Sequence, residues 1–236
     1  MLAVALIIFA GAFVQSSIGF GFALITMPLL VSMLGIRLAA PLVAIVVFLT
    51  EITIFVRYRE SFDFGMVMHL LLGAIVGIPI GLLTVRAIDS QTANVILGLI
   101  VLGYAIYALI TPRLPELAWQ GWQFIFGFFS GILSGAYNTG GPPVVIYGSC
   151  REWSPEEFKS DLQGFFMVTG VVIIVSHALS GNLTKEVGYY TLYALPGLAA
   201  GLAAGFLLSN KIRPELFHRL VLFALIALGI KLLFFS

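Results

Sequence analysis

The chain has 236 residues, of which 60% are hydrophobic and 10% are charged, whereas about 25% of the residues in a soluble domain carry a charge. The mean hydropathy of +1.08 and the net charge of +1 exclude a soluble enzyme, a disordered linker and a nucleic-acid-binding protein. Cys150 is the single cysteine, which excludes an intramolecular disulfide scaffold and a cysteine-based zinc site. We therefore expect an all-α, polytopic protein of the cell inner (cytoplasmic) membrane.

Charged residues are so sparse that they mark where the chain leaves the lipid. They separate eight hydrophobic segments, six of which have about 18–24 residues, the length of one transmembrane helix. The first (1–36) and the fifth (117–150) run for about 34–36 uncharged residues, which as one straight helix would reach roughly 50 Å across a hydrocarbon core of about 30 Å. These two segments are therefore predicted to be broken or to fold back as re-entrant hairpins. No cleavable signal peptide is expected at Met1, because no basic residue precedes the apolar run.

The two long segments resemble each other. The stretches GAFVQSSIGFGFALITMPLL (11–30) and GFFSGILSGAYNTGGPPVVIYG (127–148) each contain glycines eight residues apart, a second small or polar cluster and then proline. The third and seventh segments also match, as GAIVGIPIG (73–81) and LPGLAAGLAAG (195–205), and their glycines are attributed to close helix packing. The sequence predicts one transmembrane domain made of two four-segment repeats, residues 1–113 and 121–236.

Two topologies are open. If all eight segments cross the membrane once, the lysines and arginines divide seven to five between the two sides. If the first and fifth segments are hairpins, the division is eight to four, which the positive-inside rule favours. The hairpin topology leaves three crossings in each half, inverts one half relative to the other and puts both termini outside. The four cations on the outer side would then be Arg37, Arg86, Lys185 and Lys231.

The predicted breaks carry hydroxyls, amides and glycines but no Lys, Arg, His, Asp or Glu, so neither a metal site nor a cofactor is expected. A helix that begins inside the membrane presents unpaired backbone N–H groups and a partial positive charge, which suits a small anion with several oxygens. A cation held by unwound carbonyls is the opposite interpretation. The predicted substrate-binding residues are Gln15, Ser16, Ser17, Gly19, Gly21, Tyr137, Asn138, Thr139, Gly140 and Gly141.

Isolated polar residues inside the other segments are further candidates. Glu51 is the only carboxylate within a predicted span and is a candidate for proton coupling, with a charge at the membrane boundary as the alternative. His177 could relay protons, but we expect it to hydrogen-bond a backbone carbonyl near a span end. Gln163 is expected to join helices. An intramembrane protease using Ser134 and His177 is the enzyme alternative. However, Gly131 stands one place too early for a G-x-S-G motif, so no enzyme is expected.

A glycine-rich break followed by proline in segments one and five, within eight segments in two repeats, resembles the TauE/SafE sulfite exporter family, also called the toluene sulfonate uptake permease family. The most specific stretch is GILSGAYNTGGPP at 131–143, whereas GFGF at 19–22 stands where members more often have consecutive glycines. The resemblance implies transport of sulfur-containing or carboxylate anions, outward or inward.

We therefore expect a secondary transporter for sulfite, a sulfonate such as sulfoacetate, or a related carboxylate, which is coupled to protons and works by alternating access. A passive anion channel with a filter made from the two breaks is the alternative. The expected partners are the small anionic solute and the lipid bilayer. A homodimer is left open, and no nucleic-acid partner is expected.

Overall fold

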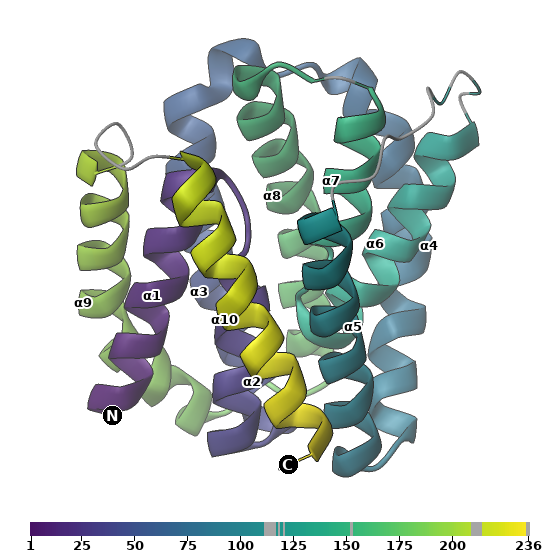
Figure 1. Ribbon diagram of the computed structural model, residues 1–236. Helices are drawn as coiled ribbons and strands as arrows, with labels where there is room; N and C mark the ends of the chain where they lie inside the picture. Colours follow the sequence, from purple (N-terminus) through teal and green to yellow (C-terminus); the bar gives the residue numbers. More distant parts are fainter. Residues whose placement is uncertain (111–116, 118, 120, 152, 209–213, 235–236) are drawn as a thin grey trace.

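The regular secondary structure of the protein is helical throughout the part described by the computed structural model, which comprises residues 1–110, 117, 119, 121–151, 153–208 and 214–234. The helices are α1 (Leu2–Ile18), α2 (Phe22–Leu34), α3 (Ile36–Tyr58), α4 (Phe64–Ala87), α5 (Ser90–Ile110), α6 (Gly121–Tyr137), α7 (Gly141–Cys150), α8 (Pro155–Leu179), α9 (Lys185–Leu208) and α10 (Pro214–Phe234), with a 3₁₀ turn, η1 (Arg59–Ser61), after α3 (Figure 1).

Five of these helices are long and apolar enough to cross a membrane, namely α3 with η1, α4, α5, α8 and α9. This confirms the expected all-helical class with several membrane spans. The predicted end of the first repeat, at residue 113, lies outside the described residues, as do the side chains of Lys211 and Arg213 that entered the charge count.

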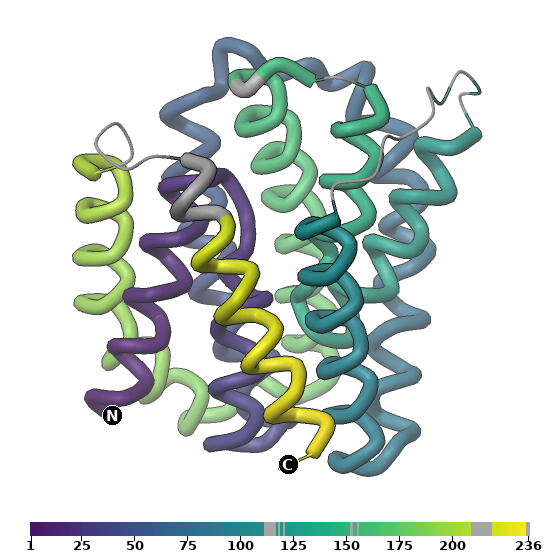
Figure 2. The backbone as a smooth tube through the Cα atoms, viewed as in Figure 1, coloured from purple at the N-terminus to yellow at the C-terminus, as the bar shows by residue number. Residues whose placement is uncertain are grey.

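Each of the two long apolar segments contains two helices. Between α1 and α2, Gly19 and Gly21 have φ angles of +92° and +104°, a conformation that glycine adopts without steric cost. Between α6 and α7, Asn138 has a φ of +57°, and asparagine is one of the few other residues that tolerate this region. In both pairs the helices pack against each other and run in opposite directions (Figures 1 and 2), so that each pair forms a hairpin.

The tightest helix pairs join α4 to α6 and α1 to α9, and each pair combines one helix from each predicted half. A Cβ atom built on Gly77 of α4 would lie 2.2 Å from the carbonyl oxygen of Phe128 in α6, and one on Gly201 of α9 would lie 2.5 Å from that of Phe9 in α1. The helix backbones are therefore in direct contact at these glycines. This confirms that the glycines of the third and seventh segments serve close packing.

The remaining helices complete the bundle, with α3 packed on α8 and α5 packed on α10. Helix α1 begins and α10 ends at the same end of the bundle (Figure 2), which is called the terminal face below. The α1–α2 hairpin has both of its outer ends on the terminal face, whereas the α6–α7 hairpin has both on the opposite face (Figure 1). The tips of the two hairpins therefore point in opposite directions inside the molecule.

Candidate functional site

The two breaks meet around one small cavity, called the break cavity below. Six of the predicted functional residues line it, namely Gln15, Gly21, Glu51, Asn138, Thr139 and Gly141. Its volume is about 30 Å³, and a second cavity of about 20 Å³ shares Glu51 and Asn138 with it. About 10–15 Å³ suffices for a water molecule. The cavities therefore have room for water but not for an oxyanion in this conformation.

The N-terminus of α2 supplies backbone donors to the break cavity. The N–H groups of Ala23 and Leu24 precede the first helical hydrogen bond of α2, and both residues line the cavity. The N–H group of Phe22 is occupied, because it donates to Gln15 Oε1 at 3.2 Å. The side chains of Ala23 and Leu24 are apolar, so the polarity of the sequence does not indicate these two residues. The signal that would have found them is their position just after Gly21.

The second break contributes side-chain groups to the break cavity, whereas the N-terminus of α7 offers few backbone N–H groups. Pro142 and Pro143 stand in the first turn of α7 and have no N–H group to offer. Thr139 Oγ1 and Asn138 Oδ1 are buried and have no hydrogen-bond partner among the described residues. Asn138 Nδ2 donates to the carbonyl oxygen of Ala40 in α3 at 2.9 Å, so the asparagine ties this break to the first long helix.

Glu51 lies on α3 and lines both small cavities, with only 5% of its surface exposed. Its Oε2 atom has no hydrogen-bond partner in the described part of the chain. A Cβ atom on Gly170 of α8 would lie 3.1 Å from this oxygen, so the glycine leaves room for the carboxyl group. The only predicted intramembrane carboxylate is therefore buried beside the two breaks, where a carboxyl group is a candidate for a functional role.

Three predicted residues have hydrogen bonds outside the break cavity. The hydroxyl groups of Ser16 and Ser17 each donate at 2.7 Å to a carbonyl oxygen one turn earlier in α1. The hydroxyl group of Tyr137 donates to the carbonyl oxygen of Ala93 in α5 at 3.1 Å. None of the three lines either of the small cavities.

Gly19 and Gly140 do not line the break cavity, and side chains of other helices hold their backbone carbonyl groups in place. Gln163 Nε2 of α8 donates to the carbonyl oxygen of Gly19, and Gln15 Nε2 donates to Gln163 Oε1 at 3.2 Å. Ser130 Oγ donates to the carbonyl oxygen of Gly140 at 2.6 Å. Gln163 therefore joins α8 to the first break, which confirms its predicted role between helices.

Replacing Gln163 with leucine is expected to lower the free energy of unfolding by about 1–3 kcal/mol, because the Gly19 carbonyl and the Gln15 amide lose buried partners. Thermal unfolding in lipid nanodiscs measures the change. Gln91→Leu, at an exposed position at the start of α5, is the control and should leave stability unchanged. Equal stability of both variants would show that the glutamine pair contributes nothing.

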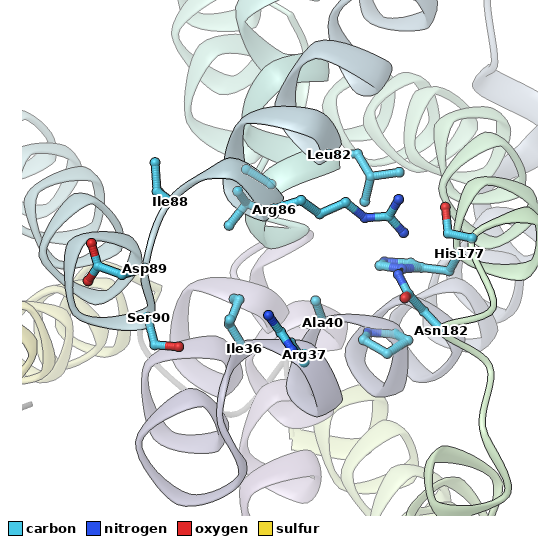
Figure 3. A pocket seen from close by; sticks show the side chains of 15 residues that line it. Ile36, Arg37, Ala40, Leu82, Arg86, Ile88, Asp89, Ser90, His177 and Asn182 are labelled. Carbon is cyan, nitrogen blue, oxygen red and sulfur yellow. The ribbon is translucent and has the colours of Figure 1, made fainter.

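A much larger cavity, of about 540 Å³ (Figure 3), lies at the terminal face, where α4 ends and α5 begins (Figure 1). Arg37 at the start of α3, Arg86 at the end of α4 and His177 at the end of α8 line it. Ala40, which accepts the hydrogen bond from Asn138, lines it as well. This contact therefore separates the large cavity from the break cavity.

The arrangement does not match the protease alternative. Ser134 lines the cavity of about 20 Å³, whereas His177 lines the cavity of about 540 Å³. Over the described ranges, no group of three or more His, Cys, Asp or Glu residues is placed to hold a metal ion.

A bundle of apolar helices in which two helix breaks meet at buried polar groups is typical of membrane transporters. The sequence profile of the family described as "Sulfite exporter TauE/SafE" matches residues 3–232. The chain belongs to this family, so it is an integral membrane protein with a transport function, and the predictions of the family and of a non-enzymatic role are confirmed.

Among curated proteins, the chain is 26% identical over 231 residues to the "Probable sulfite/organosulfonate exporter TauE" of Cupriavidus necator, a match that covers 95% of this chain and 90% of that protein. No solved structure matches the chain significantly.

Proposed function

We propose that the protein is a secondary transporter that moves a small oxyanion across the cytoplasmic membrane, namely sulfite, a sulfonate such as sulfoacetate, or a related carboxylate. The observation that carries the proposal is the break cavity, which is lined by Ala23 and Leu24, whose N–H groups precede the first helical hydrogen bond of α2, and by Thr139, whose buried hydroxyl group has no partner among the described residues. Such donors hold an anion without a formal cation. Membership of the family and the name of the relative support this class of substrate.

We also propose that the two hairpins are re-entrant and that residues 1–113 and 121–236 are inverted repeats. Two observations support this arrangement. First, the hairpins open on opposite faces of the bundle (Figure 1). Second, the first helix of each predicted repeat packs on the third segment of the other repeat, as α1 does on α9 and α6 does on α4. Under the positive-inside rule, the terminal face would then be the outer face.

The transport cycle is proposed to be alternating access around the break cavity. A space of about 30 Å³ must widen before an oxyanion enters, so the hairpins have to separate. On the terminal face, the contact between Asn138 and Ala40 closes the route from the large cavity. On the other side, Gln163 covers the first break, and the ring of Phe158 lies 6.1 Å from that of Phe20 between centroids. Transport would open these two closures in turn.

Proton coupling is proposed to act through Glu51. A carboxylate at this position and a bound oxyanion would both be attracted to the N-terminus of α2, and they would repel each other across the same cavity. A proton on Glu51 would therefore favour binding of the substrate, and loss of that proton would favour its release. The proton and the anion would then move together.

The function is tested by counterflow of sulfite, sulfoacetate, taurine and small carboxylates in proteoliposomes. Asn138→Asp should reduce counterflow at least a hundredfold, because a second negative charge about 4 Å from the anion costs about 4 kcal/mol at an effective dielectric constant of about 20. Aspartate tolerates the positive φ of this position, so the substitution changes the charge without straining the backbone.

Asn138→Gly is the matched control, since it also tolerates the positive φ and also loses the hydrogen bond to Ala40. Its rate should fall less than about tenfold, the effect of losing roughly 1 kcal/mol of hydrogen bonding. Wild-type counterflow in Asn138→Asp would contradict the proposed site. Flux that does not saturate with concentration would favour a passive channel over a transporter.

A further inference from the structure

We propose that the large cavity at the terminal face is a second oxyanion-binding site, which captures the substrate before it reaches the break cavity. The inference rests on the proposed function and assigns a separate place and separate residues to the first contact with the anion. The ligand class is a small solute with a sulfonate, sulfite or similar oxyanion group.

Two guanidinium groups line this cavity without a partner. Arg37 and Arg86 form no hydrogen bond and no ion pair with any other residue in the described ranges. They come from different helices, and Figure 3 shows Arg86 extending across the cavity toward His177. A guanidinium group offers parallel N–H donors that match the oxygens of an oxyanion, and it stays charged at any physiological pH.

His177 adds a buried donor. Its side chain is 2% exposed, and its Nδ1 atom lies 2.9 Å from Nδ2 of Asn182. An amide –NH₂ group can only donate, so Nδ1 accepts this hydrogen bond and the neutral ring carries its proton on Nε2. Nε2 is buried and has no partner among the described residues. In Figure 3 the ring points into the cavity beside the Arg86 guanidinium, where an anionic oxygen would satisfy it.

Asp89 is the one carboxylate among the residues that line the cavity, and it is already engaged. It accepts hydrogen bonds from the Thr92 N–H group at 2.9 Å and from the Thr92 hydroxyl group at 2.7 Å. These two hydrogen bonds lower the pKa of Asp89, so it remains ionised and bound to its own helix. Figure 3 places it on the far side of the cavity from His177. The wall formed by Arg86, His177 and Asn182 therefore carries donors and no competing carboxylate.

The size and position of the cavity fit a capture site. Its volume of about 540 Å³ lies within the roughly 300–1,000 Å³ of small-molecule sites. Ala40, which lines the cavity, accepts the hydrogen bond from Asn138 at the second break. The hydrogen bond between Asn138 and Ala40 therefore links a residue that lines the break cavity to one that lines the large cavity. A cationic recess of this kind raises the local concentration of anions.

The test measures binding of sulfoacetate by calorimetry in nanodiscs made only of zwitterionic phosphatidylcholine. Asn138→Asp disables the break cavity, so binding that persists in this variant comes from another site. Adding Arg37→Gln and Arg86→Gln to Asn138→Asp should weaken the remaining binding at least tenfold. Lys185→Gln is the matched control, because Lys185, the first residue of α9, is an exposed cation that does not line the cavity.

The same pair of arginine substitutions in the otherwise native chain should raise the half-saturating sulfoacetate concentration for transport from the terminal face about tenfold, whereas Lys185→Gln should leave it unchanged. An unchanged value in the arginine variant, while the native protein transports sulfoacetate, would overturn the capture site and leave the proposed function intact. Absence of any oxyanion transport by the native protein would instead defeat the proposed function. A second set of nanodiscs that contains phosphatidylglycerol tests for a lipid headgroup: if the two arginine substitutions weaken phosphatidylglycerol binding there and leave sulfoacetate binding unaffected, the cavity holds a lipid headgroup and the proposal is overturned.

Discussion

Replacing Glu51 with glutamine is expected to reduce the accumulation of substrate that a pH gradient drives by more than a factor of ten. The same substitution should leave the rate of counterflow exchange unchanged. Glutamine keeps the size of the side chain and its position against Gly170, but it has no proton to release. Exchange of one anion for another needs no net movement of protons, whereas accumulation against a gradient does. Proteoliposomes with an imposed pH gradient, compared with the same vesicles in counterflow, measure both properties.

Glu186→Gln is the control for this experiment, since it removes an exposed carboxylate at the start of α9 and should leave both kinds of flux unchanged. If Glu51→Gln accumulates substrate as well as the native protein, another group carries the proton. If it loses counterflow as well, Glu51 is needed for binding of the anion rather than for coupling.

Replacing Gly77 with alanine is expected to lower the free energy of unfolding by about 3 kcal/mol, which corresponds to a fall of roughly 6–12 °C in Tm. The new methyl group would lie 2.2 Å from the carbonyl oxygen of Phe128 and 2.9 Å from the backbone nitrogen of Ile132. These atoms belong to the α6 backbone, so the two helices have to move apart along their whole contact. Thermal unfolding in nanodiscs measures the loss.

Gly103→Ala in α5 provides the matched control, because a Cβ atom at this position meets nothing within 4 Å. Alanine favours the helix over glycine by about 1 kcal/mol, so this variant should be slightly more stable than the native protein. A similar Tm for Gly77→Ala and Gly103→Ala would mean that the α4 and α6 backbones are not in direct contact at Gly77.

The positions of the helix breaks could be predicted because the first and fifth segments are too long for one span and carry their glycines and amides in the middle. Residues 19–21 and 138–140 are where the helices are interrupted. Glu51 could be predicted because an acid inside an apolar run is conspicuous, and it lies beside both breaks.

The direction of each side chain at the breaks could not be predicted in the same way. Ser16 and Ser17 are polar residues beside a break, but a hydroxyl group in a helix readily donates to the carbonyl one turn earlier, and both do so. Ala23 and Leu24 contribute only backbone N–H groups, which every residue other than proline possesses. Polarity along the sequence therefore indicates which segments meet at the break cavity, but not which of their side chains line it.

The large cavity also lay beyond sequence reasoning. Arg37, Arg86 and His177 come from three helix ends that are far apart in the chain, and each alone resembles a charge or a hydrogen bond at a membrane boundary. Their convergence depends on the relative directions of α3, α4 and α8, which no local pattern specifies.

The contacts between α1 and α9 and between α4 and α6 constrain the order in which the protein can assemble during synthesis. When residues 1–113 have left the ribosome, neither α1 nor α4 has met the helix whose backbone it touches, because both partners belong to the part still to be made. The first hairpin can complete its contact with α9 only after Gly205 has been synthesised. The N-terminal half made alone would leave its glycine-lined surface open to lipid, and the two halves made as separate chains would complete each other.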